Sequence, residues 1–401
     1  MSRPRTLLYI DEGISFGGSL VVVSHLIRYL DPAAYRAVVV SETNDALLKQ
    51  LYPTAAARHV IKRRFNYTDW DRVRPRIRKL PTALLRSLVS LLMTIYAGLL
   101  NLPYYLKLWR LIRREGVDLI HHANGASHLV LTLMGCPYMA TMQGIKTSAF
   151  SASQRWALRR MPKFLMISEA ARRAYVEHGG RAEITETLPN PCDPRPVDAA
   201  LHDEIRQRYG LSKDEKLFAC FGRVVHWKGQ REFAQAAVRV LEAMPQARAL
   251  IVGNAADGGE DYLNEVRAIV DASPHRERVT FTGYVAAVDE LYSVIDLAVH
   301  TSVVAEPFGL VVIEPMGFGI PIIAANAGGP TEIVADGVDG YLVDPRDTDA
   351  LSERIERLLR DDELRARFGA AGLKKVEAQY HARRYTARLT EIYDELLAAR
   401  A

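Results

Sequence analysis

The sequence has little cysteine, and its N-terminal apolar stretch is soon broken by charge. Only three of the 401 residues are cysteines, at Cys136, Cys192 and Cys220, without Cys-x-x-Cys spacing and without a histidine cluster beside them. This usage argues against a disulfide framework and a structural zinc site, and it indicates a reducing compartment. Because Asp11-Glu12 interrupts the first apolar run, that run predicts a strand rather than a signal peptide.

Acidic side chains are scarce in one stretch, residues 58–114. This stretch contains 14 Lys and Arg residues against two acids, a net charge of +12, which leaves −7 for the remainder of a chain whose total is +5. The basic character is therefore local. A local excess of positive charge indicates an anionic surface or ligand.

Long hydrophobic runs are also missing from this stretch. Its apolar part, from Ser87 to Leu100, is shorter than the roughly 20 residues of a membrane span, and Asn101 and Pro103 interrupt it. Flanking basic residues are typical of a segment lying in the headgroup plane of anionic lipid, as are the amphipathic aromatics at Tyr96, Tyr104, Tyr105 and Trp109.

We therefore predict a membrane-facing segment at about 61–114. The alternative is a set of ordinary helices packed on the domain with a solvated basic face. Nucleic acid is not the expected partner, because no recognised binding motif accompanies the basic residues.

Apolar runs alternate with helical spacing in both halves of the chain. Predicted strands lie at 7–10, 38–40, 117–122, 137–144, 164–169, 217–223, 249–253, 279–284 and 297–302. Strands alternating with helices predict an α/β fold of two doubly wound parallel-sheet domains, and 49% apolar content over this length is enough for two cores. The Pro-rich stretch from Leu188 to Pro194 sets the predicted boundary.

The predicted domains are 1–193, 194–375 and a C-terminal helical segment, 376–401, for which packing back on the N-terminal domain is one arrangement. Ligands of parallel sheets bind at the carboxyl ends of the strands. Polar residues follow predicted strands of the first domain at His121, His122, Asn124, Gln143 and Gly144. For the adjacent histidines, the simplest expectation is one buried and one solvated side chain.

Two Gly-containing turns organise the second half. Glu306 and Glu314 flank a turn that leads into a helix, and Gly328-Gly329 opens another helix with Pro330 at its first position. N–H groups at a helix start favour phosphate, and a nearby carboxylate accepts hydrogen bonds from sugar or ribose hydroxyls. Arg223 and Lys228 flank another loop, where two cations would hold a diphosphate. The combination suits a nucleotide-sugar.

A Gly-rich loop is also predicted after the first strand, from Asp11 to Ser19. Gly17-Gly18 would let the backbone approach a phosphate, although tight turns contain such pairs as often. Four sequence elements therefore follow one another along the chain. They are this loop, the Arg223 to Gly229 segment, the Glu306 to Glu314 stretch and the Gly328 to Glu332 turn.

These four elements resemble the motifs of the family-4 retaining glycosyltransferases of the GT-B fold, and the resemblance covers nearly the whole chain. The Glu-x7-Glu motif of that family matches Glu306 to Glu314. The resemblance implies that the C-terminal domain binds the nucleotide-sugar and the N-terminal domain the acceptor. It also implies front-face attack, in which the departing phosphate helps to deprotonate the acceptor, so no protein nucleophile is expected.

The resemblance implies a role for each matching residue. Arg223 and Lys228 would grip the diphosphate, Glu306 would contact donor-sugar hydroxyls, and Glu314 would bind the ribose. Further donor contacts would come from the backbone, at Gly17, Gly18, Phe308, Gly309, Leu310 and Val311. Base contacts are expected near Gly253 and Gly283-Tyr284.

One position departs from the family pattern. Many relatives end a strand of the first domain with His-Gly, where this chain has Gln143-Gly144. Glutamine hydrogen-bonds but cannot titrate, so a protonic role there is in doubt. His121 and His122 are nearby candidates with a looser match. The predicted catalytic set is Glu306, Arg223, Lys228, His122 and Gln143.

Metal ions and cofactors are not expected. Two Asp-x-Asp sequences resemble those of metal-dependent sugar transferases, but Asp69-Trp70-Asp71 lies in the basic segment and Asp347-Thr348-Asp349 precedes a helix, where Asp is a good cap. We interpret both as coincidental. The expected co-substrate is a UDP- or GDP-sugar.

The leading hypothesis is retaining transfer of a sugar to a lipid-linked or membrane-presented glycan or glycolipid in cell-envelope polysaccharide synthesis. The protein would be cytoplasmic and peripheral on the inner face of the cell membrane. One alternative is a sugar-nucleotide epimerase or phosphorylase on a similar scaffold, although no obvious acidic pair is available. Another is a catalytically silent nucleotide-binding protein, to which the Gln143 departure gives some weight.

Overall fold

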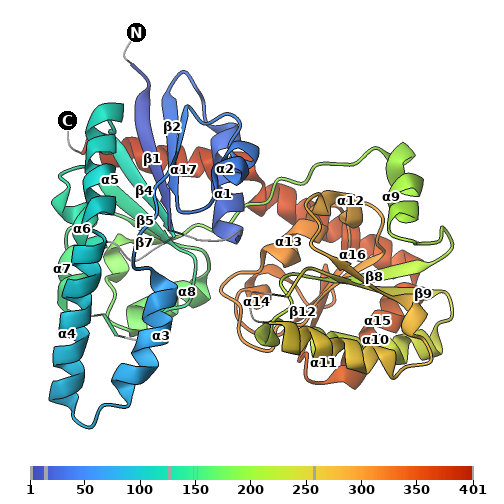
Figure 1. Cartoon of the computed structure of the whole chain (residues 1–401). Coiled ribbons are helices and arrows are strands. Elements are labelled where there is room, and N and C mark those ends of the chain that lie inside the picture. Colours follow the sequence, from blue (N-terminus) through green and yellow to red (C-terminus); the bar gives the residue numbers. More distant parts are fainter. Residues whose placement is uncertain are drawn as a thin grey trace. The chain divides into compact units, whose positions relative to one another are not determined.

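Two parallel β-sheets, each flanked by helices, make up the computed structural model (Figure 1). The structure describes residues 3–12, 17–124, 128–147, 149–150, 152–255 and 259–399. The first sheet has seven strands in the order β3-β2-β1-β4-β5-β6-β7, and the second has six in the order β10-β9-β8-β11-β12-β13. This α/β architecture of two doubly wound sheets is the fold that the alternation of strands and helices predicts.

The first sheet is built from near-continuous apolar runs. Leu8 of β1 pairs in register with Val38 of β2 and Ile120 of β4, and all three are fully buried. Strands covered by helices on both faces read as such runs. The strands are β1 (Arg5–Asp11), β2 (Tyr35–Ser41), β3 (Ala57–Val60), β4 (Leu119–Asn124), β5 (Tyr138–Met142), β6 (Phe164–Met166) and β7 (Thr185–Thr187).

The helices between these strands begin at recognisable caps. Asn44 Oδ1 accepts from the N–H of Leu47 at 2.8 Å, and Ser168 Oγ accepts from the N–H of Ala171 at 3.0 Å. The helices are α1 (Gly18–Tyr29), α2 (Asp45–Leu51), α3 (Tyr67–Arg78), α4 (Ala83–Leu100), α5 (Leu102–Glu115), α6 (His128–Leu133), α7 (Ala152–Leu158) and α8 (Glu169–Glu177).

The basic, apolar segment forms α3, α4 and α5. Helix α4 is exposed along almost its whole length, with Leu84 82% and Leu99 66% exposed. Helix α5 instead buries one face in the core of the sheet, including Tyr104 and Leu108. The expectation that Tyr104 lies among headgroups is therefore wrong, because the alternative of a packed helix with a solvated basic face describes α5.

A buried asparagine fixes the junction between α4 and α5. Asn101 Nδ2 donates to the carbonyl of Phe65 at 2.7 Å, and its Oδ1 accepts from the N–H groups of Arg64 and Phe65 at 2.9 and 3.0 Å. In the described part of the chain, no single helix is long and apolar enough to cross a membrane. Helix α4 from Leu84 and helix α5 reach that length and apolarity only when they are taken together, and the pair is bent by 51°.

The second sheet separates two apolar clusters. Phe218 and Cys220 of β8 pack in one cluster with Phe233, whereas Leu217 and Ala219 pack in the other. This alternation is the two-residue period of a strand with both faces covered. The strands, all parallel, are β8 (Lys216–Phe221), β9 (Ala247–Val252), β10 (Val279–Gly283), β11 (Leu297–His300), β12 (Ile322–Ala325) and β13 (Gly340–Val343).

The helices of the second half follow the same strand-to-helix order. Gln230–Ala243, for example, follows β8 and the loop that carries Lys228. The helices are α9 (His202–Arg208), α10 (Gln230–Ala243), α11 (Glu260–Asp271), α12 (Val288–Tyr292), α13 (Leu310–Gly317), α14 (Pro330–Ile333), α15 (Thr348–Arg360), α16 (Asp362–Lys375) and α17 (Ala382–Ala398).

The chain divides into two compact units whose limits differ from the predicted domains. Unit 1 comprises Met1–Met166, Ala174–Glu186 and Thr386–Ala401, and unit 2 comprises Ile167–Arg173 and Thr187–Tyr385. The predicted boundary at 193 therefore lies inside unit 2, and the predicted segment 376–401 is divided within α17. The crossing at 167–173 was not predicted at all.

Specific contacts explain these limits. Both carboxylate oxygens of Glu332 accept from the N–H groups of Glu169 and Ala170, at 2.8 and 2.7 Å, and so bind residues 167–173 into unit 2. The end of α17 is held within unit 1, where Arg388 Nε donates to Glu186 Oε1 at 2.8 Å and Tyr393 Oη lies 2.6 Å from His121 Nδ1.

Candidate functional site

The predicted residues of unit 2 gather at the carboxyl ends of its parallel strands. Arg223 follows β8, Gly283 ends β10, Glu306 follows β11 and Gly328 follows β12. Strands β8, β11 and β12 are consecutive in the sheet, and β9 lies between β8 and β10. This edge of a parallel sheet is where ligands bind.

The two Gly-containing turns are locked together by their backbones. The N–H of Gly329 donates to the carbonyl of Glu306 at 2.8 Å. A Cβ added to Gly328, whose φ is +71°, would lie 2.3 Å from the Glu306 carbonyl oxygen, and one added to Gly329 would lie 2.3 Å from Phe308. Glycine is therefore required at both positions by close packing, and the packing fixes where Glu306 points.

Three side chains hold the Glu306 carboxylate. Lys228 Nζ lies 2.5 Å from Oε1, His300 Nε2 lies 2.5 Å from Oε2, and Ser302 Oγ donates to Oε2 at 2.9 Å. Burial acts to raise the pKa of this carboxyl, but the hydrogen bonds from His300 and Lys228 and the charge of Lys228 outweigh it and hold the pKa far below its usual range. Glu306 is therefore an ionised hydrogen-bond acceptor.

The loop before α10 delivers Lys228 to this carboxylate. Gly229 has φ of +71°, and a Cβ there would lie 1.9 Å from the carbonyl oxygen of Thr301. The N–H of Val303 donates to the Trp227 carbonyl at 2.9 Å. Lys228 Nζ also lies 4.6 Å from the centroid of the Trp227 ring. The loop therefore packs directly on the end of β11.

The two predicted diphosphate ligands have different surroundings. Lys228 is 11% exposed and paired with Glu306, whereas Arg223 is exposed. Within the described ranges, no acidic side chain lies within ion-pair distance of Arg223. Arg223 therefore offers an uncompensated positive charge at the sheet edge, while most of the Lys228 charge is balanced.

Helix α13 carries the second carboxylate. Gly309, with φ of +115°, begins the helix, and its first turn contains Leu310 and Val311. N–H groups of a first turn have no acceptor within the helix. Tyr292 Oη donates to Glu314 Oε2 at 2.9 Å. Desolvation raises the pKa of Glu314 to about 7, although the Tyr292 hydrogen bond acts to lower it.

The predicted base-contacting residues also lie at this edge. The N–H of Gly253 donates to the Gly283 carbonyl at 2.9 Å, and a Cβ on Gly253 would lie 2.0 Å from the Gly222 carbonyl oxygen. The ends of β8, β9 and β10 therefore approach backbone to backbone. Tyr284 follows with its side chain 56% exposed.

Both adjacent histidines of unit 1 are buried, so the expectation of one solvated ring is wrong. Strand β4 pairs with β1 along one edge and with β5 along the other, and its side chains from Leu119 to Ala123 are buried. His121 contacts Tyr393 and lies 2.8 Å from Thr141 Oγ1, and burial, with a smaller contribution from His122, lowers its pKa to about 3. His122 Nε2 lies 3.6 Å from Glu12 Oε1.

The remaining predicted residues of unit 1 are only partly described. Gly13 to Phe16 of the Gly-rich loop lie outside the described residues. Gly17 has φ of −160°, an extended conformation open to any residue, and Gly18 begins α1. Gln143 follows β5 and is partly exposed. Their contacts with a donor stay predictions.

A buried ionic cluster at the same edge of the first sheet escaped the sequence analysis. Arg63 Nη1 lies 2.6 Å from Glu12 Oε2, and its Nε pairs with Glu42. Glu12 follows β1, Glu42 follows β2, and Arg63 follows β3. Burial raises the pKa of Glu42 against the opposing effect of Arg63. The cluster anchors the chain that leads into α3.

Four residues of unit 2 were also missed or misread. His300 ends β11 and Ser302 lies two residues beyond it, and the rule that strand ends carry ligands would have located them. Tyr292 gave no sequence signal. Glu332 ends the Gly328 to Glu332 turn, but its carboxylate caps α8 as described above, so its contacts are structural.

The Asp-x-Asp sequences have ordinary structural contacts. Asp347 Oδ1 accepts from the N–H of Ala350 at 3.0 Å, which confirms the predicted cap, and Asp349 pairs with Arg239. Asp69 Oδ2 accepts from the N–H of Asn66 at 2.9 Å, while the side chain of Asp71 lies outside the described part. Among described side chains, no three His, Cys, Asp or Glu residues are grouped to hold a metal ion.

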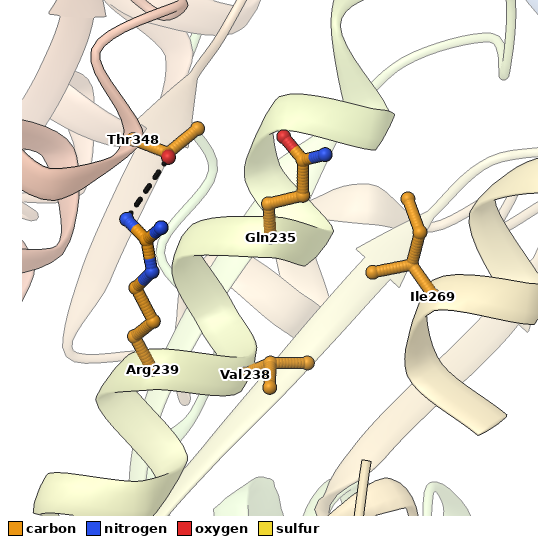
Figure 2. Close-up of a pocket in the computed structure, with 5 residues that line it drawn as sticks. All are labelled: Gln235, Val238, Arg239, Ile269 and Thr348. Atoms are coloured by element: carbon orange, nitrogen blue, oxygen red, sulfur yellow. Dashed lines mark hydrogen bonds between the residues drawn. The ribbon is translucent and has the colours of Figure 1, made fainter. Parts of the chain in front are cut away.

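A separate pocket lies on the helical surface of unit 2 (Figure 2). It is lined by Gln235, Val238, Arg239, Ile269 and Thr348, and Arg239 Nη1 donates to Thr348 Oγ1 at 3.0 Å. None of the predicted site residues lines it. The pocket is therefore not the candidate site.

Comparisons with known proteins assign the family. Residues 202–375 match the model of glycosyl transferases group 1, and residues 16–195 match that of glycosyltransferase family 4. Among solved structures, the Anabaena HepE complex with UDP and glucose has a TM-score of 0.77 at 23% identity, covering 97% of this chain and 99% of that one. A Rickettsia africae glycosyltransferase has a TM-score of 0.79 at 16% identity, covering 99% of both.

Curated relatives match over shorter lengths. The Mycobacterium tuberculosis GDP-mannose-dependent alpha-(1-6)-phosphatidylinositol monomannoside mannosyltransferase is 31% identical over 237 residues, which is 56% of this chain and 60% of that protein. The Bacillus subtilis protein YtcC is 26% identical over 306 residues, 71% of this chain and 74% of that protein. Taken with the two family models, these similarities show that the chain belongs to the family-4 type of glycosyltransferases with the GT-B fold.

Proposed function

We propose that the protein is a retaining, metal-independent glycosyltransferase that moves a sugar from a UDP- or GDP-sugar to a membrane-presented acceptor. The observation that carries this proposal is the Glu306 carboxylate, which Lys228, His300 and Ser302 hold ionised at the strand edge that also carries Arg223. An ionised carboxylate with fixed orientation suits acceptance of hydrogen bonds from sugar hydroxyls.

The charges at this edge support the proposed chemistry. Arg223 and Lys228 would bind the diphosphate and stabilise the negative charge that develops on it as the bond to the sugar breaks. Because the pKa of Glu306 lies far below neutral, this residue would act as an acceptor of hydrogen bonds and not as a proton shuttle. In the proposed front-face reaction, the departing phosphate takes up the acceptor proton.

The donor ribose would bind at Glu314, beside the first turn of α13. Gly309, Leu310 and Val311 begin that helix, whose N–H groups suit a diphosphate or ribose. The similar proteins support both candidate nucleotides: HepE was solved with UDP-glucose, and the M. tuberculosis relative is GDP-mannose-dependent. The donor is accordingly proposed as a UDP- or GDP-sugar.

The acceptor is proposed to be a lipid-linked glycan or glycolipid of the cell envelope, reached from the cytoplasmic face of an anionic membrane. Helix α4 supports this, because it exposes Leu88, Leu91 and Leu92, each more than half, and Arg86 lies exposed beside them. Arg72 of α3 adds an exposed positive charge. Apolar insertion with flanking cations suits anionic lipid.

The donor reaction can be tested with a panel of UDP- and GDP-sugars and glycolipid acceptors. Wild-type protein is expected to form a glycosylated product, and Arg223→Ala to lower kcat/KM by roughly 100-fold because the diphosphate loses a charge-assisted contact. Arg239→Ala is the matched control, since this arginine pairs with Asp349 on the other surface pocket. Full activity of Arg223→Ala would contradict the assignment of Arg223 to the donor site. Isomerised donor without acceptor would indicate an epimerase instead.

Membrane binding has a separate test. Co-sedimentation with liposomes is expected to rise with the anionic lipid fraction and to fall with added salt, because salt screens exposed charges. The double variant Leu91→Glu/Leu92→Glu is expected to lose binding, whereas Leu201→Glu, at an exposed leucine of unit 2, is not. Binding that ignores lipid charge and survives the double variant would refute the membrane proposal.

A further inference from the structure

His300 occupies a position between the sheet and the Glu306 carboxylate. Its ring is 3% exposed at the end of β11. The N–H of Ala325, at the end of the neighbouring β12, lies 3.3 Å from Nδ1, and Glu306 Oε2 lies 2.5 Å from Nε2. The imidazole thus connects the backbone of one strand to the carboxylate that follows the other.

These two contacts select one tautomer. A backbone N–H can only donate, so Nδ1 of the ring is the acceptor for Ala325. In the neutral ring the proton then resides on Nε2 and is donated to Glu306. The contact at the carboxylate is therefore a charge-assisted hydrogen bond, which is among the stronger kinds.

The other two partners do not fix the carboxylate alone. Lys228 reaches Oε1 through a flexible side chain, and Ser302 reaches Oε2 from the same turn as Glu306. Lysine is a point charge that imposes little direction. His300 is the partner anchored in the sheet, so it sets the plane of the carboxylate and the direction of the lone pairs left for a ligand.

We infer that His300 is a positioning residue for sugar transfer, which orients Glu306 toward the donor-sugar hydroxyls through its Nε2–H. This inference rests on the proposed function. Holding a reacting group in place accelerates the step, and a misplacement of about 1 Å can cost on the order of 100-fold in rate. The diphosphate contacts proposed for Arg223 do not pass through His300.

Two substitutions distinguish the contact made by Nε2 of the ring from the contact made by Nδ1. The side-chain amide nitrogen of His300→Gln can take the place of Nε2 and keep the hydrogen bond to Glu306. The amide of His300→Asn is one carbon shorter, so it can meet Ala325 at the place of Nδ1 but does not reach Glu306. Both variants therefore place a polar amide at this buried position. His300→Gln keeps the hydrogen bond to Glu306, and His300→Asn removes it.

The experiment measures kcat and KM for transfer, Kd for UDP and GDP by calorimetry, and Tm for both variants and wild type. We expect His300→Asn to lower kcat on the order of 100-fold and His300→Gln to retain most of it. Both variants are expected to keep the nucleoside diphosphate Kd, because the contacts proposed with the diphosphate are unchanged. The Tm is expected to fall in His300→Asn, because the buried Glu306 carboxylate loses a charge-assisted hydrogen bond, and to stay near the wild-type value in His300→Gln, which keeps that bond.

Other outcomes overturn the inference. Wild-type kcat in His300→Asn would show that the contact does not position Glu306. Equal losses of kcat in both variants, with weaker diphosphate binding and lower Tm, would show that His300 only stabilises the fold. If wild-type protein turns over no nucleotide-sugar, the proposed function fails and this inference fails with it.

Discussion

Glu306 and Glu314 belong to one short stretch but lie in opposite electrostatic environments. Three donors from β11 and the Lys228 loop surround Glu306 and hold its pKa far below the usual range. Glu314 has Tyr292 as its hydrogen-bond donor, and desolvation raises its pKa to about 7. Two identical side chains in one motif therefore have different chemistry, because their partners come from other elements.

The largest effect is expected from neutralising Glu306. Glu306→Gln keeps the shape of the side chain but removes the charge that faces Lys228 and the proposed sugar, so kcat is expected to fall by roughly 100- to 1000-fold. Steady-state kinetics at saturating donor measure this fall. Glu314→Gln is the comparison, with a smaller loss that appears mainly in KM. Equal losses in kcat would remove the proposed difference between the two roles.

A smaller effect is expected from pH, and part of it should depend on Glu314. As pH rises from about 6 to about 8, Glu314 becomes ionised and a stronger acceptor for ribose hydroxyls, so binding of UDP or GDP is expected to tighten by roughly three- to tenfold. Calorimetry across this range measures it. Glu314→Gln is expected to reduce the slope to the part that comes from the terminal phosphate of the nucleotide, which ionises at about pH 6. A slope equal to that of wild type would show that Glu314 does not contribute.

The raised pKa of Glu314 also makes the stability of the fold depend on pH. A carboxyl whose native pKa lies above its unfolded value favours folding most below that unfolded value, and the contribution is lost as pH rises through the native pKa. For Glu314 the window runs from about 4.5 to about 7. The Tm of Glu314→Gln is therefore expected to exceed that of wild type increasingly as pH rises across this window.

The smallest effect is expected from Tyr292→Phe. This change removes the hydrogen bond that lowers the Glu314 pKa, so the midpoint of the pH-dependent binding is expected to move upward. The free energy of unfolding is expected to fall by about 1 kcal/mol. Thermal denaturation and the binding curve measure the two effects. A midpoint that moves downward would mean that Tyr292 does not stabilise the ionised form.

Much of the fold was predictable because the signal is local. Buried strands read as apolar runs, and the predicted strands at 7–10, 249–253 and 297–302 correspond to β1, β9 and β11. Four strands were missed. Strands β3 and β7 are short, partly exposed and polar, whereas β12 and β13 are mostly buried but only four residues long each. The crossing at 167–173 depends on Glu332, far away in the chain, and no local pattern encodes it.

The residues of the candidate site could be proposed from the sequence, but the side chains that contact them could not. Glu306 and Lys228 were located, yet their pairing and the contact with His300 join residues that are far apart or on different strands. In unit 1, sequence alone could not tell that β4 is covered on both sides, so the burial of both His121 and His122 was missed. Pairing and burial are set by tertiary packing.

The cap that Glu332 provides to α8 affects how this enzyme family can be recombined. A C-terminal half cut out at residue 194 would lack residues 167–173, and the Glu332 carboxylate would lose both backbone donors. A hybrid with another family member would pair Glu332 with foreign backbone donors unless residues 167–173 came from the same parent as the rest of unit 2. Successful exchange of unit 2 therefore requires both of its chain segments, Ile167–Arg173 and Thr187–Tyr385, rather than a single junction.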